Sequence, residues 1–75
     1  MDCIILNWDD LRVGMHVRYG NGKKVWCVAR IDTFQDQAHP YRFVEIELCG
    51  LALVDRYQHW YIREDLIQEG VLTSA

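Results

Sequence analysis

Six side chains in this sequence carry atoms that bind zinc well. They are three cysteines and three histidines: Cys3, His16, Cys27, His39, Cys49 and His59. Zinc sites usually include two ligands within a few positions of each other, as in Cys-x-x-Cys or His-x₃₋₅-His. No pair in this chain has that spacing. The sequence therefore predicts core thiols and surface imidazoles, with no metal and no other cofactor.

The cysteines also bear on compartment and catalysis. Three widely spaced cysteines are not a disulfide framework. The apolar run at 3–6 is too short for a signal peptide or a membrane span. We therefore expect reduced thiols in a cytoplasmic protein that does not enter a membrane. A nucleophile pair of Cys27 or Cys49 with His59 stays open, because such pairs assemble across distant sequence, but no motif supports it.

Two further groups suggest chemistry and have simpler interpretations. Residues 20–24, Gly-Asn-Gly-Lys-Lys, lack the spacing and the final Ser or Thr of a phosphate-binding loop, and they favour a tight turn. Glu45 and Glu47 lie about 7 Å apart on one face of a strand. A solvated face opposite Arg18 or Arg30 is the favoured interpretation of that pair. The sequence thus predicts a protein that is not an enzyme and has no catalytic residues.

The elements that position these side chains are mostly strands. Period-two alternation, with Asn21-Gly22 as a hairpin turn, predicts strands over 13–19, 24–34, 42–48 and 59–62 and a short closing strand at 71–72. A capped turn is expected at 7–11, a bulge or bend at Gly50, a turn at 55–58 and a helical turn at 63–67 that ends near Gly70. This pattern is typical of a small sandwich or barrel.

The alternation also predicts a core. The residues on the consistent apolar face of their strands are Val17, Val44, Ile46, Leu48 and Ile62. The second strand is apolar on both faces, with Val25, Cys27, Ala29 and Ile31 on one face and Trp26 and Val28 on the other. We assign Trp26 and Phe43 to the outer surface, because their parity opposes the main apolar face. At 75 residues the chain makes one domain, 1–75, with its core at about 11–72.

Two segments resemble the SH3-like small-barrel superfamily. Asp10-Leu11-Arg12-Val13-Gly14-Met15-His16-Val17-Arg18 looks like the lead-in to the first strand, and Trp60-Tyr61-Ile62-Arg63-Glu64-Asp65-Leu66 looks like the last long strand and its one-turn helix. The resemblance implies an all-β, mainly antiparallel, five-stranded barrel with one helical turn near the C-terminus. The superfamily includes Tudor and KOW modules, enzyme subunits and type II dihydrofolate reductases, so the fold alone implies no function. At 58–61, where the reductase has Val-Gln-Ile-Tyr, only the tyrosine matches.

A concentration of aromatic and basic side chains gives the functional hypothesis. The candidate binding residues are Trp26, Arg30, Tyr41, Arg42, Phe43, Trp60 and Tyr61. Aromatic rings beside arginines are typical of protein interfaces, so we expect a protein partner or self-association into a homo-oligomer. The alternative is an RNA- or DNA-binding module that uses the basic first hairpin, since residues 12–42 carry six basic side chains against two acidic ones. The net charge of −3 disfavours that alternative. A small enzyme or enzyme subunit comes third.

Overall fold

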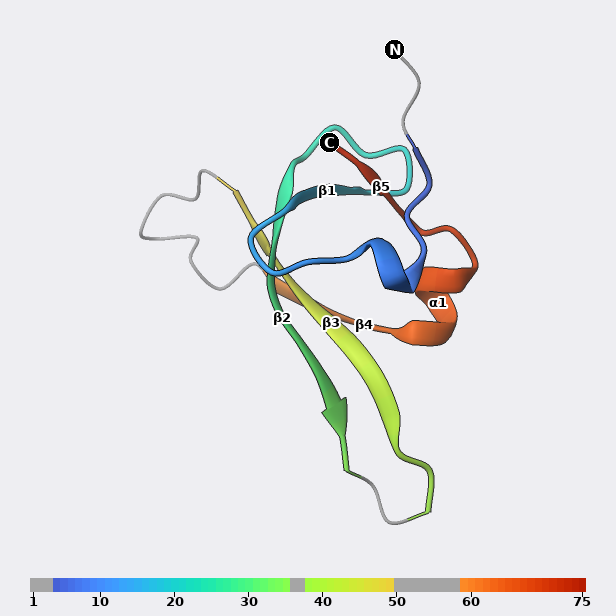
Figure 1. Cartoon of the computed structure of the whole chain (residues 1–75). Helices are drawn as coiled ribbons and strands as arrows, with labels where there is room; N and C mark the ends of the chain where they lie inside the picture. Colours follow the sequence, from blue (N-terminus) through green and yellow to red (C-terminus); the bar gives the residue numbers. More distant parts are fainter. Residues whose placement is uncertain (1–3, 36–37, 50–58) are drawn as a thin grey trace.

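The protein forms one five-stranded antiparallel sheet, and its two short helical segments lie beside each other (Figure 1). The computed structural model describes residues 4–35, 38–49 and 59–75. The elements in chain order are a 3₁₀ turn η1 (Trp8–Asp10), β1 (His16–Tyr19), β2 (Trp26–Phe34), β3 (Tyr41–Leu48), β4 (His59–Arg63), α1 (Glu64–Gln68) and β5 (Leu72–Ser74). The predicted bend at Gly50 and turn at 55–58 lie outside the described residues.

The sheet is open, and this corrects the expectation of a closed barrel. The strand order is β4-β3-β2-β1-β5, so β4 and β5 are the two ends of the sheet. The free edge of β5 pairs with the N-terminal segment, whereas a closed barrel would require it to pair with β4. Leu6 donates its backbone N–H to the carbonyl of Leu72 at 2.9 Å, and Ser74 donates to the carbonyl of Ile4 at 2.8 Å. Figure 1 shows the blue N-terminal segment beside red β5.

The core lies on one face of the sheet, under η1 and α1. Its buried members are Leu6, Trp8, Leu11, Val17, Trp26, Val28, Val44, Ile46, Ile62, Ile67 and Leu72. The predicted core residues Val17, Val44, Ile46 and Ile62 are at most 3 % exposed, which confirms their assignment. Leu48 is half-buried and packs against this core.

β2 contains a bulge at which its side chains switch from one face of the sheet to the other. The sequence pattern places the side chains before the bulge on the wrong face. Trp26 and Val28 point into the core, opposite to the expected parity. The pairing with β3 then shifts between Val28 and Arg30, so that Ile31 rather than Arg30 is brought opposite the buried Val44. One extra residue on a bulged strand reverses the facing of the residues after it. The single-parity interpretation of 24–34 therefore fails, and Trp26 is a core residue with 7 % exposure.

The short helix α1 closes the core at the end of β4. Ile67 is fully buried, whereas Leu66 is 40 % exposed, so the helix turns one side to the sheet. Gly70 ends this turn with a φ of +89°, a conformation that glycine adopts without the steric cost of a Cβ. The predicted helical turn that ends near Gly70 is confirmed. Across the described segments 4–35, 38–49 and 59–75, no helix has the length and apolar character needed to span a membrane.

Candidate functional site

A cleft of about 430 Å³ lies on the face of β2, β3 and β4 that points away from the core, and we call it the aromatic cleft. The residues that line it are Arg30, Phe34, Tyr41, Phe43, Tyr61 and Arg63. Register brings them together, because Phe34 pairs with Tyr41, and Phe43 pairs with Arg63. On β3, Phe43 and Glu45 alternate with Val44 and Ile46, which are buried in the core. Phe43 and Glu45 therefore point to the opposite face of the sheet, where the cleft lies.

The rings in the cleft form one continuous set of contacts. Phe34 stacks on Tyr41 with ring centroids 5.1 Å apart, and Tyr41 meets Phe43 edge to face at 6.4 Å. Phe43 in turn meets Tyr61 edge to face at 5.8 Å. These separations lie within the range in which aromatic pairs attract each other. The set runs from the distal end of the β2–β3 hairpin to the edge strand β4.

Exposure differs sharply between the centre and the rim of the cleft. Phe43 is only 9 % exposed, although it is not a member of the main core. Tyr61 and Phe34 are 57 % and 50 % exposed. Large rings exposed around a buried ring leave contiguous apolar surface in water, which is characteristic of interaction sites. Phe43 forms the floor of the cleft, and its exposed neighbours are available for contact.

Two arginines complete the cleft as cations over aromatic rings. The guanidinium carbon of Arg63 lies 4.3 Å from the centroid of Tyr41, and that of Arg30 lies 5.2 Å from the centroid of Phe43. Within 6 Å a cation over a ring face is attracted by the ring quadrupole. No acidic residue of the described ranges is among the lining residues, so the two guanidinium groups are the charged groups that line the cleft.

Carboxylates at the rim hold these arginines only loosely. Arg30 is 3.6 Å from Asp32 and 3.4 Å from Glu45, and Arg63 is 3.5 Å from Asp65. These nitrogen-to-oxygen distances exceed those of good hydrogen bonds. Exposed ion pairs of this kind contribute little to the free energy of folding. The predicted pairing of the glutamate face with Arg30 is confirmed for Glu45. Both arginines keep donors for a further carboxylate.

His59 and Glu45 form the tightest polar contact beside the cleft. His59 Nδ1 lies 2.9 Å from Glu45 Oε2, across the β3–β4 ladder. Its ring also meets Tyr61 edge to face at 5.4 Å. The imidazole is thus held by a carboxylate and a ring, and this contact does not support the open hypothesis of a nucleophile pair between His59 and a cysteine.

The structure brings four of the seven predicted binding residues together and separates three. Arg30, Tyr41, Phe43 and Tyr61 share the cleft. Trp26 is a core residue, which contradicts its expected position on the outer surface. Trp60 is 61 % exposed and lines a different cavity of about 190 Å³ with Tyr19 and Trp26.

Arg42 lies away from the cleft and has a structural role. Its Nε donates to Glu64 Oε1 at 2.9 Å, which ties β3 to α1. Its guanidinium carbon also lies 5.0 Å from the ring centroid of Trp8. The hydrogen bond to Glu64 raises the pKa of the Arg42 guanidinium above its ordinary value. These contacts engage the side chain with the protein itself.

Sequence reasoning missed Phe34 and Arg63. Phe34 carries no local signal for the cleft, because only the register of β2 and β3 brings it opposite Tyr41. Arg63 was assigned to the helical turn, whereas it is the last residue of β4. Its parity with Tyr61 then places it on the same face.

Cys27 and Cys49 form a disulfide, and this overturns the expectation that both are reduced thiols. Cys49 donates its backbone N–H to the carbonyl of Val25 at 2.9 Å, which aligns it beside β2. The Cα atoms of the two cysteines are 5.8 Å apart, within the range that a disulfide spans. The expected cytoplasmic location rested in part on reduced cysteines, and that part of its support is lost. Cys3 lies outside the described residues.

Comparisons with known proteins add no relative. No protein-family model, no curated protein and no solved structure matches this chain. The resemblance to the SH3-like superfamily therefore rests on the two sequence segments alone, and the structure supports the coarser description of a small antiparallel β fold.

Proposed function

We propose that this protein is a non-enzymatic binding module that captures an extended, acidic segment of a protein partner in the aromatic cleft. The observation that carries the proposal is the exposure of Tyr61 and Phe34 around the buried ring of Phe43. Interface hot spots combine large aromatic anchors with arginine, and this cleft contains both.

The charge of the cleft selects the chemistry of the partner. Arg30 and Arg63 stand over the rings, and no acid of the described ranges lines the cleft. An apolar partner side chain would pack on the floor formed by Phe43, and an adjacent aspartate or glutamate would accept hydrogen bonds from an arginine. Hydrogen bonds to charged partners are stronger than those between neutral groups.

The position of β4 favours an extended segment over a globular surface. β4 is an edge strand of the sheet, and no strand in the described ranges pairs with its outer edge. Unpaired backbone groups at a sheet edge accept an added strand, and alternate side chains of that strand then enter pockets on one face. Tyr61 lies on this edge strand and also lines the cleft, so backbone pairing and ring contacts would reinforce each other.

Single-stranded RNA or DNA is the second candidate ligand. Bases stack on exposed aromatic rings, and arginines contact phosphates. Against it, the chain has a net charge of −3, whereas non-specific nucleic-acid binders are usually basic. The basic first hairpin, with Arg18, Lys23 and Lys24, is separate from the rings of the cleft.

A display experiment tests the proposal. Linear peptides displayed on phage are selected on the immobilised protein, and binders are counter-selected on the Tyr61→Ala variant. We expect enrichment of sequences with an apolar residue next to Asp or Glu. Recovery of no peptide that distinguishes the two proteins would refute the proposal.

Two parallel measurements identify the competing occupants. Anisotropy of labelled oligothymidine and single-stranded RNA would show binding that falls steeply with salt if nucleic acid is the ligand. Sedimentation equilibrium would show a dimer that Tyr61→Ala dissociates if a second copy covers the cleft. Either result would contradict the assignment of a protein segment as the ligand.

A further inference from the structure

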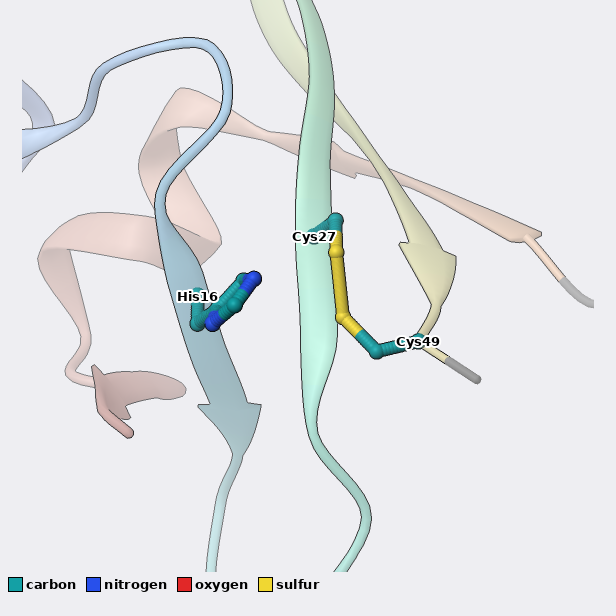
Figure 2. Close-up of side chains that lie close together, drawn as sticks. All are labelled: His16, Cys27 and Cys49. Atoms are coloured by element: carbon teal, nitrogen blue, oxygen red, sulfur yellow. A yellow bond between two sulfur atoms is a disulfide. The ribbon is translucent and has the colours of Figure 1, made fainter. Parts of the chain in front are cut away.

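Three side chains on neighbouring parts of the sheet place a nitrogen and two sulfur ligand atoms within 4.8 Å of one another (Figure 2). They are His16 of β1, Cys27 of β2 and Cys49, which directly follows β3. His16 and Cys27 are direct cross-strand partners, and the disulfide joins Cys27 to Cys49. Residues far apart in the sequence are thus brought to one place by strand pairing, without any short ligand motif.

The chemistry of this set is that of a zinc site. Two thiolates and one imidazole are the ligands that Zn²⁺ prefers, with Zn–S bonds of about 2.3 Å and Zn–N bonds of about 2.0–2.1 Å. Tetrahedral coordination at those bond lengths holds the ligand atoms roughly 3.5–3.8 Å apart. The spread of 4.8 Å in the structure therefore requires only small side-chain movements.

The His16 imidazole is available for coordination. The side chain is exposed, and across the described residues it makes no hydrogen bond or ion pair with another side chain. His59 differs, because a carboxylate of Glu45 holds its ring at 2.9 Å. The two cysteines are half-buried, so a metal ion bound there would sit at the surface with solvent on one side.

We propose that reduction of the Cys27–Cys49 disulfide creates a Zn²⁺ site with Cys27, Cys49 and His16 as its three protein ligands. A dithiol supplies two electrons and two protons. Its own sulfurs become joined, the Cys27–Cys49 bond breaks, and each cysteine gains one hydrogen. Zn²⁺ then displaces both thiol protons and accepts the imidazole nitrogen, which leaves the fourth position to water or to a group from another molecule.

The disulfide and the metal exclude each other in this scheme. Sulfurs bonded to one another have no thiolate charge to offer, and metal ligation requires the thiolate. The site would thus report the redox state of its surroundings, with a disulfide in the oxidised form and a metal in the reduced form. This inference is independent of the aromatic cleft, since none of the three residues lines that cleft.

Cobalt spectroscopy tests the proposal directly. The Cys3→Ser variant serves as the background, so that Cys27 and Cys49 are the remaining cysteines. The protein is first reduced with a trialkylphosphine. The phosphorus takes the oxygen atom of a water molecule, and the two cysteines take its hydrogens. Co²⁺ is then titrated into the reduced protein. We expect one equivalent to give the intense visible absorption of tetrahedral cobalt and a thiolate charge-transfer band, and Zn²⁺ to remove both.

Matched histidine variants identify the third ligand. His16→Gln should weaken Co²⁺ and Zn²⁺ affinity by at least about tenfold, by analogy with the loss caused by removing partners of metal ligands, and it should reduce the visible absorption. His39→Gln changes an exposed histidine outside the cluster and should leave the titration unchanged. Equal titrations for the two variants would overturn the assignment of His16.

Two further outcomes decide the remaining parts of the proposal. Zn²⁺ should raise the melting temperature of the reduced protein, because a ligand that binds the folded state stabilises it. The oxidised protein should show neither this shift nor the cobalt spectrum. No cobalt spectrum and no zinc-dependent stabilisation in the reduced protein, or an equal response from the oxidised protein, would refute the redox-controlled site.

Discussion

Phe43 and Tyr61 meet edge to face across the β3–β4 ladder, with ring centroids 5.8 Å apart. One ring is 9 % exposed and the other is 57 % exposed. This contact joins a buried platform to an exposed anchor on the free edge of the sheet. The proposed binding function follows from that combination, because the anchor can contact a partner while the platform holds its position.

The arginines of the cleft should contribute to binding of an acidic peptide. Arg63→Gln removes the cation that lies 4.3 Å from Tyr41 and should weaken binding of a selected acidic peptide, with a larger loss at low salt, where charges are less screened. Arg42→Gln is the matched control, because Arg42 contacts Glu64 and Trp8 away from the cleft. Fluorescence anisotropy at two salt concentrations measures both variants. A similar loss for the two would show that the effect of Arg63 is not local.

Ile46 should be essential for stability. It is completely buried between neighbours on β2 and β4, so Ile46→Ala should lower the free energy of unfolding by about 2–5 kcal/mol. Val13→Ala removes the same class of atoms from a side chain that is 64 % exposed, and it should change stability by less than about 0.5 kcal/mol. Urea denaturation of the oxidised protein compares them. A small effect at Ile46 would contradict the assigned core.

Trp26 should behave as a core residue and not as a binding residue. Its ring is 7 % exposed within the main core, so Trp26→Ala should cost about 3–5 kcal/mol of stability. That is a large share of the roughly 5–15 kcal/mol that stabilises ordinary domains. Trp26→Phe should retain the fold and bind a selected peptide as the wild type does. A fully stable Trp26→Ala variant that loses only peptide binding would show that the ring belongs to the binding surface and not to the core.

The sequence predicted the elements that depend on local pattern. Alternation around Val44, Ile46 and Ile62 identified the inner face of β3 and β4, and Gly70 marked the end of the helix. The facing of Trp26 was not predictable, because the bulge between Val28 and Arg30 reverses parity within one strand. Alternation alone carries no signal for such a shift.

Long-range pairing accounts for the other errors. The disulfide depends on the register that places Cys49 beside Val25, and spacing along the chain does not reveal that register. The open sheet results from residues 4–6 pairing with β5, where barrel closure would need β4. In the cleft, the sequence supplied Arg30, Tyr41, Phe43 and Tyr61 by residue type, but only the register adds Phe34.

Reduction should destabilise the protein measurably. The disulfide closes a loop with a sequence separation of 22, and a loop of that size contributes about 3 kcal/mol in the chain-entropy description. In metal-free buffer, a phosphine reductant should therefore lower the melting temperature. The Cys27→Ser/Cys49→Ser double variant should melt at the lower temperature with or without reductant. Identical melting of the oxidised and reduced wild type would contradict a stabilising disulfide.

The most direct test of the binding function compares two exposed tyrosines on different faces. Tyr61 is 57 % exposed in the aromatic cleft, and Tyr19 is 47 % exposed beside the separate cavity that contains Trp60. Isothermal titration of the tightest selected peptide should show that Tyr61→Ala weakens binding by more than about 1 kcal/mol, as expected for a hot spot. Tyr19→Ala should leave the affinity within about twofold. Equal affinities for the two folded variants would contradict the aromatic cleft as the binding site.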